Sequence, residues 1–531
     1  MLIKKFNIIR NLKLFISYIT TKSPFLLLII ILPNILFHFD FFNFSIRTDS
    51  NILYDFSSSW RVHLDMLFNE NNIYEDFYYS YPPVGLYIIK CLFYFVSNNI
   101  FLQSIITLFI TLGTFVVFIC FCSKKIKKKN HIFIVCCISL LFFNSTTQEI
   151  CIGGNPFPLF LGVFFFILGL SLSDRNFVLS LLFLMLSCSC KLEFWPPSLI
   201  LILSNFNRKN IIYILIFSTT FFILNYNLGY NTFEIITGFG RSEWARWLPD
   251  YESIIPQIVL LLIALVIKNI RLLVVLSVLS VITFYLSDFF YATFFSKKMF
   301  FLLSLFPFIF IKNKKIFISL LVLLSFQLRR GFEFAEPAFL LLAPLVLFYI
   351  LGTVNLNNFK LRFLKTTILQ IFLVAIIGVF INRIAYPILI SKDLQLHRTS
   401  VGNITSTNNP ETISFFIKTL ANKKVISIPH CSGVSYISGA YHCIPVLHFY
   451  DRNTIQEYDY YAKVLNLFPD YFVIDGSQFS NYPKLQVPFM RFRLKTNKQN
   501  LSEQYHEIFK IIQEKYKRVF LKDNFTVYKK L

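Results

Sequence analysis

Acidic side chains gather in one stretch of the chain, residues 40–99. The stretch contains Asp49, Asp55, Asp65, Glu70, Glu75 and Asp76 among Tyr and Phe residues, and Tyr81-Pro82-Pro83 closes it. A carboxylate within reach of a substrate hydroxyl acts as a general base, and Asp49 together with Asp55 offers the oxygen ligands that a divalent cation prefers. Asp49 also has a purely structural interpretation, as an alternative to a general base or a cation ligand. An Asp followed by Ser and Asn suits a helix N-cap or an Asx turn.

Basic side chains expected on the same side of the molecule form the second chemical group. The main candidates are Lys191, Arg241, Arg246, Lys297 and Lys298. Arg binds phosphate in a bidentate manner and Lys binds it as a point charge. Lys191 interrupts a short apolar hairpin, where a buried charge costs about 2.5 to 3.5 kcal/mol on insertion scales. Such a residue faces a polar cavity, pairs with the nearby Glu193 or extends its amine to the surface.

The composition identifies the elements that must position these residues. Of 531 residues, 55% are hydrophobic and 15% are charged, whereas soluble domains carry about 25% charged residues. The mean hydropathy is +0.60, and runs such as FLLLIIIL are apolar on every face, which excludes an alternating transmembrane barrel. The sequence therefore predicts an all-α polytopic membrane protein.

The distribution of positive charge predicts the topology. The formal net charge is +23, but the basic residues fall in short clusters between apolar runs, which argues for the positive-inside rule and against nucleic-acid binding. We expect a multi-pass plasma (inner) membrane protein with a cytoplasmic N-terminus. The C-terminus then lies on the periplasmic or extracellular side. Asp49 follows the first span by about ten residues and would lie at the membrane surface, so we take it as the general base, with Asp55 in reserve.

About thirteen spans satisfy these constraints. They cover approximately 24–39, 100–122, 132–147, 157–173, 177–190, 196–206, 211–227, 254–267, 272–290, 299–311, 316–328, 338–353 and 366–386. Residues 1–389 would form the transmembrane catalytic domain, with 40–99 as its first outside loop. Within that loop, 84–98 reads as an interfacial helix, because counting it as a crossing would break the parity.

Residues 390–531 have an ordinary soluble composition and predict a small non-cytoplasmic α+β domain. Helical patterns cover 411–421 and 501–515, and strand patterns cover 423–429, 470–475 and 525–530. Cys431 and Cys443 lie here, each after a His, without a usual zinc spacing; whether they form a disulfide is left open. No ligand cluster indicates a metal, so no cofactor is expected, although a divalent ion remains an alternative.

The first outside loop and the apolar layout together resemble a known family. An Asp after the first span, Tyr54, then Ile-Tyr-Glu-Asp-Phe with Asp76, and finally Tyr81-Pro82-Pro83 are similar to the GT-C superfamily of polyprenyl-phosphate-sugar-dependent glycosyltransferases. Among these the chain is most similar to the mannosyltransferase-type branch with the Tyr-Pro-Pro-Leu signature. Val84 stands where that signature has Leu.

The resemblance implies an inverting sugar transfer outside the cytoplasm. The donor would be a sugar on a polyprenyl phosphate, with mannose as the default of this branch, and the acceptor a cell-envelope lipid, glycan or protein. The phosphate is already a good leaving group, so one carboxylate suffices as the base. The cations would hold the phosphate, while Tyr54, Asp76, Tyr81, Pro82 and Pro83 would support the loop. The competing hypothesis is a transporter or flippase of a lipid-linked sugar, for which charges along the spans are expected.

Overall fold

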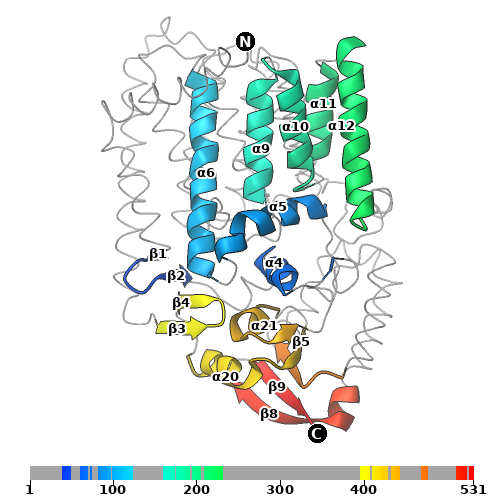
Figure 1. Cartoon of the computed structure of the whole chain (residues 1–531). Helices are drawn as coiled ribbons and strands as arrows, with labels where there is room; N and C mark the ends of the chain where they lie inside the picture. Colours follow the sequence, from blue (N-terminus) through cyan, green and yellow to red (C-terminus); the bar gives the residue numbers. More distant parts are fainter. Residues whose placement is uncertain are drawn as a thin grey trace, which may run out of the picture.

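The computed structural model places helices in one layer and two small sheets in another, with short helices between them (Figure 1). The residues that the structure describes are 39–48, 60–69, 72–73, 82–96, 99–123, 159–173, 175–191, 194–204, 208–230, 395–406, 410–428, 432–442, 468–475, 510–522 and 525–531.

Five helices stand side by side in the first layer (Figure 1). They are α6 (Ile100–Ser123), α9 (Leu159–Leu172), α10 (Phe177–Cys188), α11 (Trp195–Ser204) and α12 (Arg208–Asn227). Each coincides to within a few residues with a helix that an apolar run predicts. Taken over the described residues, no helix has both the length and the apolar character of a membrane span.

Glycine and serine bring α9 and α10 close together. The Ser180 hydroxyl donates to the Gly169 carbonyl at 2.7 Å, and seven residues further along α10 the Ser187 hydroxyl donates to the Gly162 carbonyl at 2.7 Å. A Cβ at Gly169 would come within 2.7 Å of the Leu184 side chain. Small residues at this spacing let two backbones approach and satisfy hydroxyl groups that would otherwise be buried without partners.

Two short helices lie between the layers. α5 (Pro83–Phe93) runs across the lower ends of the upright helices, and α4 (Trp60–Phe68) lies beneath it (Figure 1). A single 3₁₀ turn, η2 (Tyr94–Val96), extends α5. The helix expected over 84–98 is therefore present, and its axis crosses those of its neighbours.

The first sheet joins segments that are distant in sequence. Its order is β1 (Phe39–Asp40), β2 (Ser45–Thr48), β4 (Gly402–Ser406), β3 (Gln395–Thr399). β2 and β4 are parallel, with Ser45 opposite Asn403 and Thr48 opposite Ser406. The expected boundary at residue 389/390 therefore separates strands that share a sheet, a pairing that the sequence did not predict.

The second sheet belongs to the C-terminal segment alone. Its order is β6 (Tyr441–His442), β5 (Lys424–Ile428), β7 (Tyr471–Asp475), β9 (Phe525–Lys530), β8 (Tyr516–Lys522). Helices α20 (Pro410–Leu420) and α21 (Ser432–Ser438) accompany it.

Several elements of this segment agree with the sequence patterns. β5, β7, β9 and α20 confirm the strands and the first helix predicted there, and 510–515 are helical within the predicted 501–515. β3, β4, β6, β8 and α21 were not predicted. The mixture of strands and helices in this segment is the one expected of an α+β unit.

Candidate functional site

Few of the residues chosen from the sequence are among those that the structure describes. Lys191, Pro82 and Pro83 are described. Asp49, Asp55, Tyr54, Asp76, Tyr81, Arg241, Arg246, Lys297 and Lys298 lie outside the described residues, as do Cys431 and Cys443. The geometry of the candidate site is therefore built from the two prolines, the lysine and their surroundings.

Pro82 and Pro83 set the start of α5. Pro82 has φ −56° and ψ 124°, an extended conformation, and Pro83 is the first residue of the helix. Proline suits this place because the first helical N–H has no intrahelical acceptor and the fixed φ is already helical. Pro82, Pro83 and Gly85 are all buried. Pro82 and Pro83 therefore start a helix in the interior, between the two layers.

The first turn of α5 packs directly on the end of α10. The Gly85 amide donates to the Ser189 carbonyl at 2.9 Å. A Cβ at Gly85 would lie 2.7 Å from that carbonyl oxygen and 2.8 Å from the Cys190 Cα, so only glycine allows this approach. Lys191 follows in the same turn, since its amide donates to the Ser187 carbonyl at 3.2 Å. Two features that the sequence suggested independently are thereby brought together.

Lys191 is one of the most deeply buried charged residues described. Its exposed fraction is 1%, so the amine does not extend to the outer surface, which excludes one of the three arrangements expected for it. Phe194, three residues on, is also buried and contacts Phe166 of α9, with ring centroids 5.6 Å apart. Lys191 is thus buried at the end of a helix hairpin, three residues before a buried aromatic contact.

Lys90, on the last turn of α5, links α5 to α4. Its ammonium group donates to the Leu67 carbonyl at 2.8 Å, near the C-terminus of α4. A cation at this place satisfies a terminal carbonyl and opposes the negative end of the helix dipole. The contact fixes α4 beneath α5.

Arg61 and Asp65 lie on α4, where it meets α6 and α21. Arg61 is 1% exposed, and its Nη2 donates to the Ser104 hydroxyl of α6 at 2.6 Å. Burial lowers the pKa of Arg61 to about 10, with Tyr436 of α21 acting in the opposite direction, so the guanidinium stays charged at neutral pH. Burial raises the pKa of Tyr436, and the positive charge of Arg61 partly offsets this rise.

Asp65 is a partly buried carboxyl in the same group. Burial raises its pKa to about 6. A carboxyl with this pKa is mostly ionised at neutral pH and accepts protons readily. The sequence analysis counted Asp65 among the loop acids and assigned it no role. Asp65 follows Arg61 by four residues, a spacing that places both side chains on one face of a helix. This spacing is the sequence feature from which the pair could have been predicted.

Metal ligands do not gather in the part of the chain that the structure describes, which contains no group of three or more His, Cys, Asp or Glu side chains placed to hold an ion. Cys91, Cys188 and Cys190 are free thiols. The described site is thus a set of cations and one titratable carboxyl around α5: Lys191 at its start, Lys90 at its end, and Arg61 with Asp65 on α4. No protein-family model matches the chain, and neither a curated protein nor a solved structure matches it.

Proposed function

We propose that the protein is an integral-membrane glycosyltransferase that moves a sugar from a polyprenyl phosphate to an acceptor hydroxyl on the non-cytoplasmic side of the plasma membrane. The observation that carries the proposal is the packing of Gly85 on Ser189 and Cys190. It brings the helix start at Pro82-Pro83 and the buried Lys191 to the same end of the upright helices. An acid-rich loop and a phosphate-binding cation are the two parts that such a transfer needs at one place.

The outward face of α12 supports a membrane setting. Ile212, Leu215, Ile216 and Ile223 are all exposed, and Leu215 in the middle of the helix is 60% exposed. Inward positions recur every three to four residues, ending at the buried Phe221 and Asn225. A helix that is apolar on the side away from its neighbours is suited to lipid, whereas water favours polar residues there.

The chemistry follows from the leaving group. The departing polyprenyl phosphate carries close to two negative charges and needs little or no proton. Asp49 takes the proton from the acceptor oxygen as that oxygen attacks the anomeric carbon, and one displacement inverts the configuration. Lys191 offsets the charge that develops on the leaving phosphate. No cofactor takes part in this scheme.

Reconstitution of the transfer tests the proposal. Membranes from cells that lack the protein supply the native acceptor, and purified protein is added with labelled polyprenyl-phosphate sugars, mannose among them. We expect wild type and Glu514→Gln to transfer label and Asp49→Asn to transfer none. Glu514 is an exposed carboxylate in the C-terminal segment and controls for the loss of one negative charge.

A second pair of variants examines the donor phosphate. Lys191→Met should raise KM for the donor and lower kcat, whereas Lys517→Met, which removes an exposed lysine of β8, should change neither. Lys191→Arg keeps the charge and should retain part of the activity. If folded wild type moves label across the bilayer without transferring it to any acceptor, the protein is a transporter of lipid-linked sugars and the proposal fails.

A further inference from the structure

A tight hairpin, β1–β2, presents aromatic side chains to the outside of the molecule. Phe39 pairs with Ile46 and Asp40 with Ser45, and the turn between the strands is Phe41-Phe42-Asn43-Phe44. Phe42 is 97% exposed, and Phe41 and Phe44 are also exposed. A phenylalanine normally buries its ring, so three exposed rings in one four-residue turn require a partner outside the chain.

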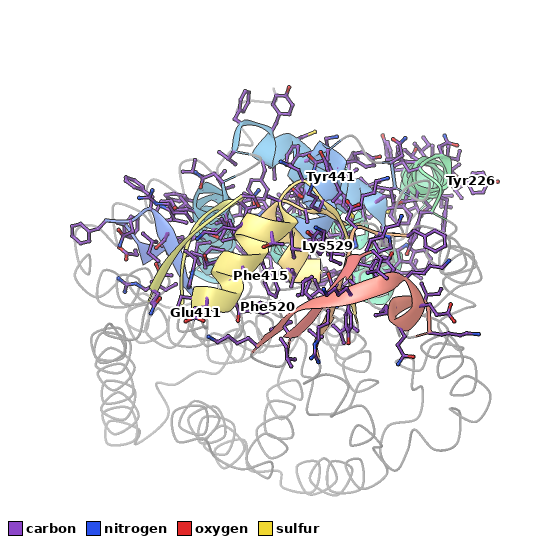
Figure 2. All side chains as sticks on the ribbon, turned by 90° about the horizontal axis from the view of Figure 1, so that it is seen from below. Tyr226, Glu411, Phe415, Tyr441, Phe520 and Lys529 are labelled. Carbon is purple, nitrogen blue, oxygen red and sulfur yellow. The ribbon has the colours of Figure 1, made fainter. Side chains whose placement is uncertain are left out.

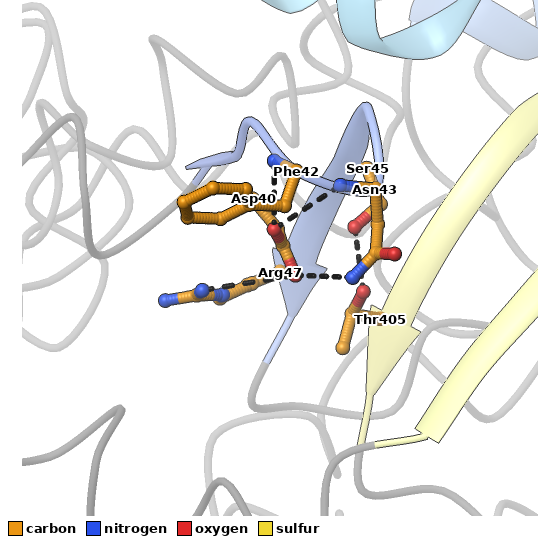
Figure 3. Close-up of polar contacts among 6 residues, drawn as sticks. All are labelled: Asp40, Phe42, Asn43, Ser45, Arg47 and Thr405. Carbon is orange, nitrogen blue, oxygen red and sulfur yellow. Dashed lines mark hydrogen bonds and ion pairs between the residues drawn. The ribbon is translucent and has the colours of Figure 1, made fainter.

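The turn holds this conformation through a network of polar contacts. The Asp40 carboxylate accepts from the amides of Phe42 at 3.2 Å and Asn43 at 3.3 Å, and from the Asn43 side-chain amide at 2.9 Å (Figure 3). Arg47 approaches the same carboxylate at 3.7 Å. Phe44 has φ 46°, in the left-handed region that bulky residues rarely adopt. The exposed rings are therefore presented by a defined backbone.

The root of the hairpin is fixed to the beginning of α6. The rings of Phe39, Phe41 and Phe44 lie 5.7, 5.8 and 5.8 Å from the Phe101 ring, each in an edge-on contact. Phe101 is the second residue of α6, and the amide of Ile100 donates to the Val401 carbonyl of the β3–β4 turn at 2.8 Å. The hairpin tip and the first sheet are thus held at the level where α6 begins.

A second pair of exposed rings lies at the same level. Tyr94 and Phe95 end the α5 segment, a few residues before α6 starts, and Phe95 is 93% exposed. Their rings contact each other at 5.4 Å. The Asn99 amide, next to the first residue of α6, donates to the Val96 carbonyl at 3.0 Å, so this second aromatic group also lies close to the beginning of α6.

We propose that the Phe41–Phe44 turn, together with Tyr94 and Phe95, inserts into the headgroup region of the outer leaflet and fastens the first sheet to the bilayer. The inference rests on the membrane location in the proposed function and is independent of sugar transfer. Two features favour lipid as the occupant: the apolar run over 24–39 leads directly into β1, and the outward face of α12, elsewhere on the molecule, is apolar as well. Aromatic rings collect at this depth of a bilayer.

The parallel pairing of β2 with β4 gives the insertion a consequence for the C-terminal segment. Ser45 and Thr405 share a buried hydroxyl hydrogen bond of 2.6 Å across these strands (Figure 3). The C-terminal strands β3 and β4 are therefore held at the membrane surface through the hairpin, in addition to their covalent connection.

Site-specific photocrosslinking of the full chain in lipid nanodiscs tests the inference. Phe42→p-benzoylphenylalanine and Phe95→p-benzoylphenylalanine are irradiated and the adducts are identified by mass spectrometry. Leu215→p-benzoylphenylalanine on α12 is the lipid control, and Leu521→p-benzoylphenylalanine is the water control, since Leu521 is an exposed residue of β8 in the C-terminal sheet.

We expect lipid adducts at positions 42, 95 and 215 and none at 521. Lipid adducts at 215 without any at 42 would overturn the inference, as would adducts at 42 to a second copy of the chain or to another protein. Equal lipid labelling at 42 and 521 would also overturn it. Because the readout needs no sugar transfer, lipid adducts from a preparation that transfers no sugar would separate failure of the glycosyltransferase proposal from failure of the membrane contact.

Discussion

Helices α12 and α20 have similar internal spacing and opposite outer faces. α20 buries Thr412, Ile413, Phe416 and Leu420 and exposes Glu411 and Lys418. Phe415, also on α20, stacks on Phe520 of β8 with ring centroids 4.1 Å apart (Figure 2). Among the described residues of α12 only Phe221 and Asn225 are buried, and its outer face consists mainly of Ile, Leu, Phe and Tyr, with Tyr226 at the margin of the molecule (Figure 2).

The difference separates what folding requires from what the surroundings require. The inner row of each helix recurs at three to four residues because it must face a neighbour. The outer face has no such neighbour, so its residue types depend on the solvent around it. α20 has the charged outer face expected of a helix in water, whereas the apolar outer face of α12 is the one that the proposed membrane location requires.

Removing an inner ring should have the largest effect on stability. Phe416 is fully buried and contacts Phe525 at a centroid distance of 5.5 Å. Phe416→Ala should lower the free energy of unfolding by about 3 to 5 kcal/mol. Ile216→Ala on the outer face of α12 removes an exposed side chain and should change it by less than about 1 kcal/mol. Thermal unfolding of both purified variants measures the difference, and equal losses would show that the face of α12 is packed against protein.

Placing a charge on an outer face distinguishes lipid from water. Leu215 of α12 and Leu521 of β8 are 60% and 62% exposed, so they form a matched pair. Leu215→Arg should cost about 2.5 to 3.5 kcal/mol in membrane insertion, while Leu521→Arg should cost nothing measurable. The amount of each variant that is recovered folded from membranes is the measurement. If the two variants behave alike, α12 faces water and the membrane setting is wrong.

The helices were the most predictable part of the fold, because their information is local. The apolar runs predicted α6 and α9 to α12, and the helix expected over 84–98 corresponds to α5 and η2. The first sheet could not be predicted in this way. Ser45 pairs with Asn403 across more than three hundred residues, and strands of two to five residues carry too little alternation to be recognised. Its partners become apparent only when the chain is folded.

The candidate site likewise combines residues that local sequence patterns indicate with contacts that these patterns do not predict. The Tyr-Pro-Pro motif and Lys191 were each noticed from residue type and spacing, but the proximity of Pro82-Pro83 to Lys191 depends on Gly85 fitting against Cys190. Arg61 was considered only as one of several possible phosphate-binding cations, and Asp65 only as one of the loop acids. Their burial depends on α6 and on Tyr436 of α21, which no local pattern connects to α4.

Gly85 lies at the contact between the start of α5 and the turn that follows α10. Replacing it with a larger residue tests whether these two parts are coupled. The Cβ of Gly85→Ala would lie 2.7 Å from the Ser189 carbonyl oxygen, and the displacement of α5 should cost about 1 to 3 kcal/mol. Gly113→Ala is the control, since its nearest neighbour is 3.9 Å away and alanine favours the helix by up to about 1 kcal/mol. Sugar transfer should fall in Gly85→Ala and persist in Gly113→Ala. Full activity and stability in both would show that α5 need not contact the turn before Lys191.

Asp65 offers the smallest and most specific test of the contact between α4 and α21. Its pKa is raised to about 6 in the folded protein, so folding disfavours the ionised carboxylate. The stability it provides is complete below about pH 4, the unfolded pKa, and is lost as the pH rises through 6. Asp65→Asn should therefore be more stable than wild type at pH 7.5, by about 1 to 2 kcal/mol, and equal to it near pH 4.

Glu514→Gln, at an exposed position, is the control for the loss of one negative charge. Unfolding temperatures of wild type and both variants between pH 4 and 8 provide the comparison. A difference between Asp65→Asn and wild type that does not change with pH would mean that the carboxyl of Asp65 titrates as it would in water. In that case the α4 surface near Arg61 would be hydrated, and α21 would not exclude water from it.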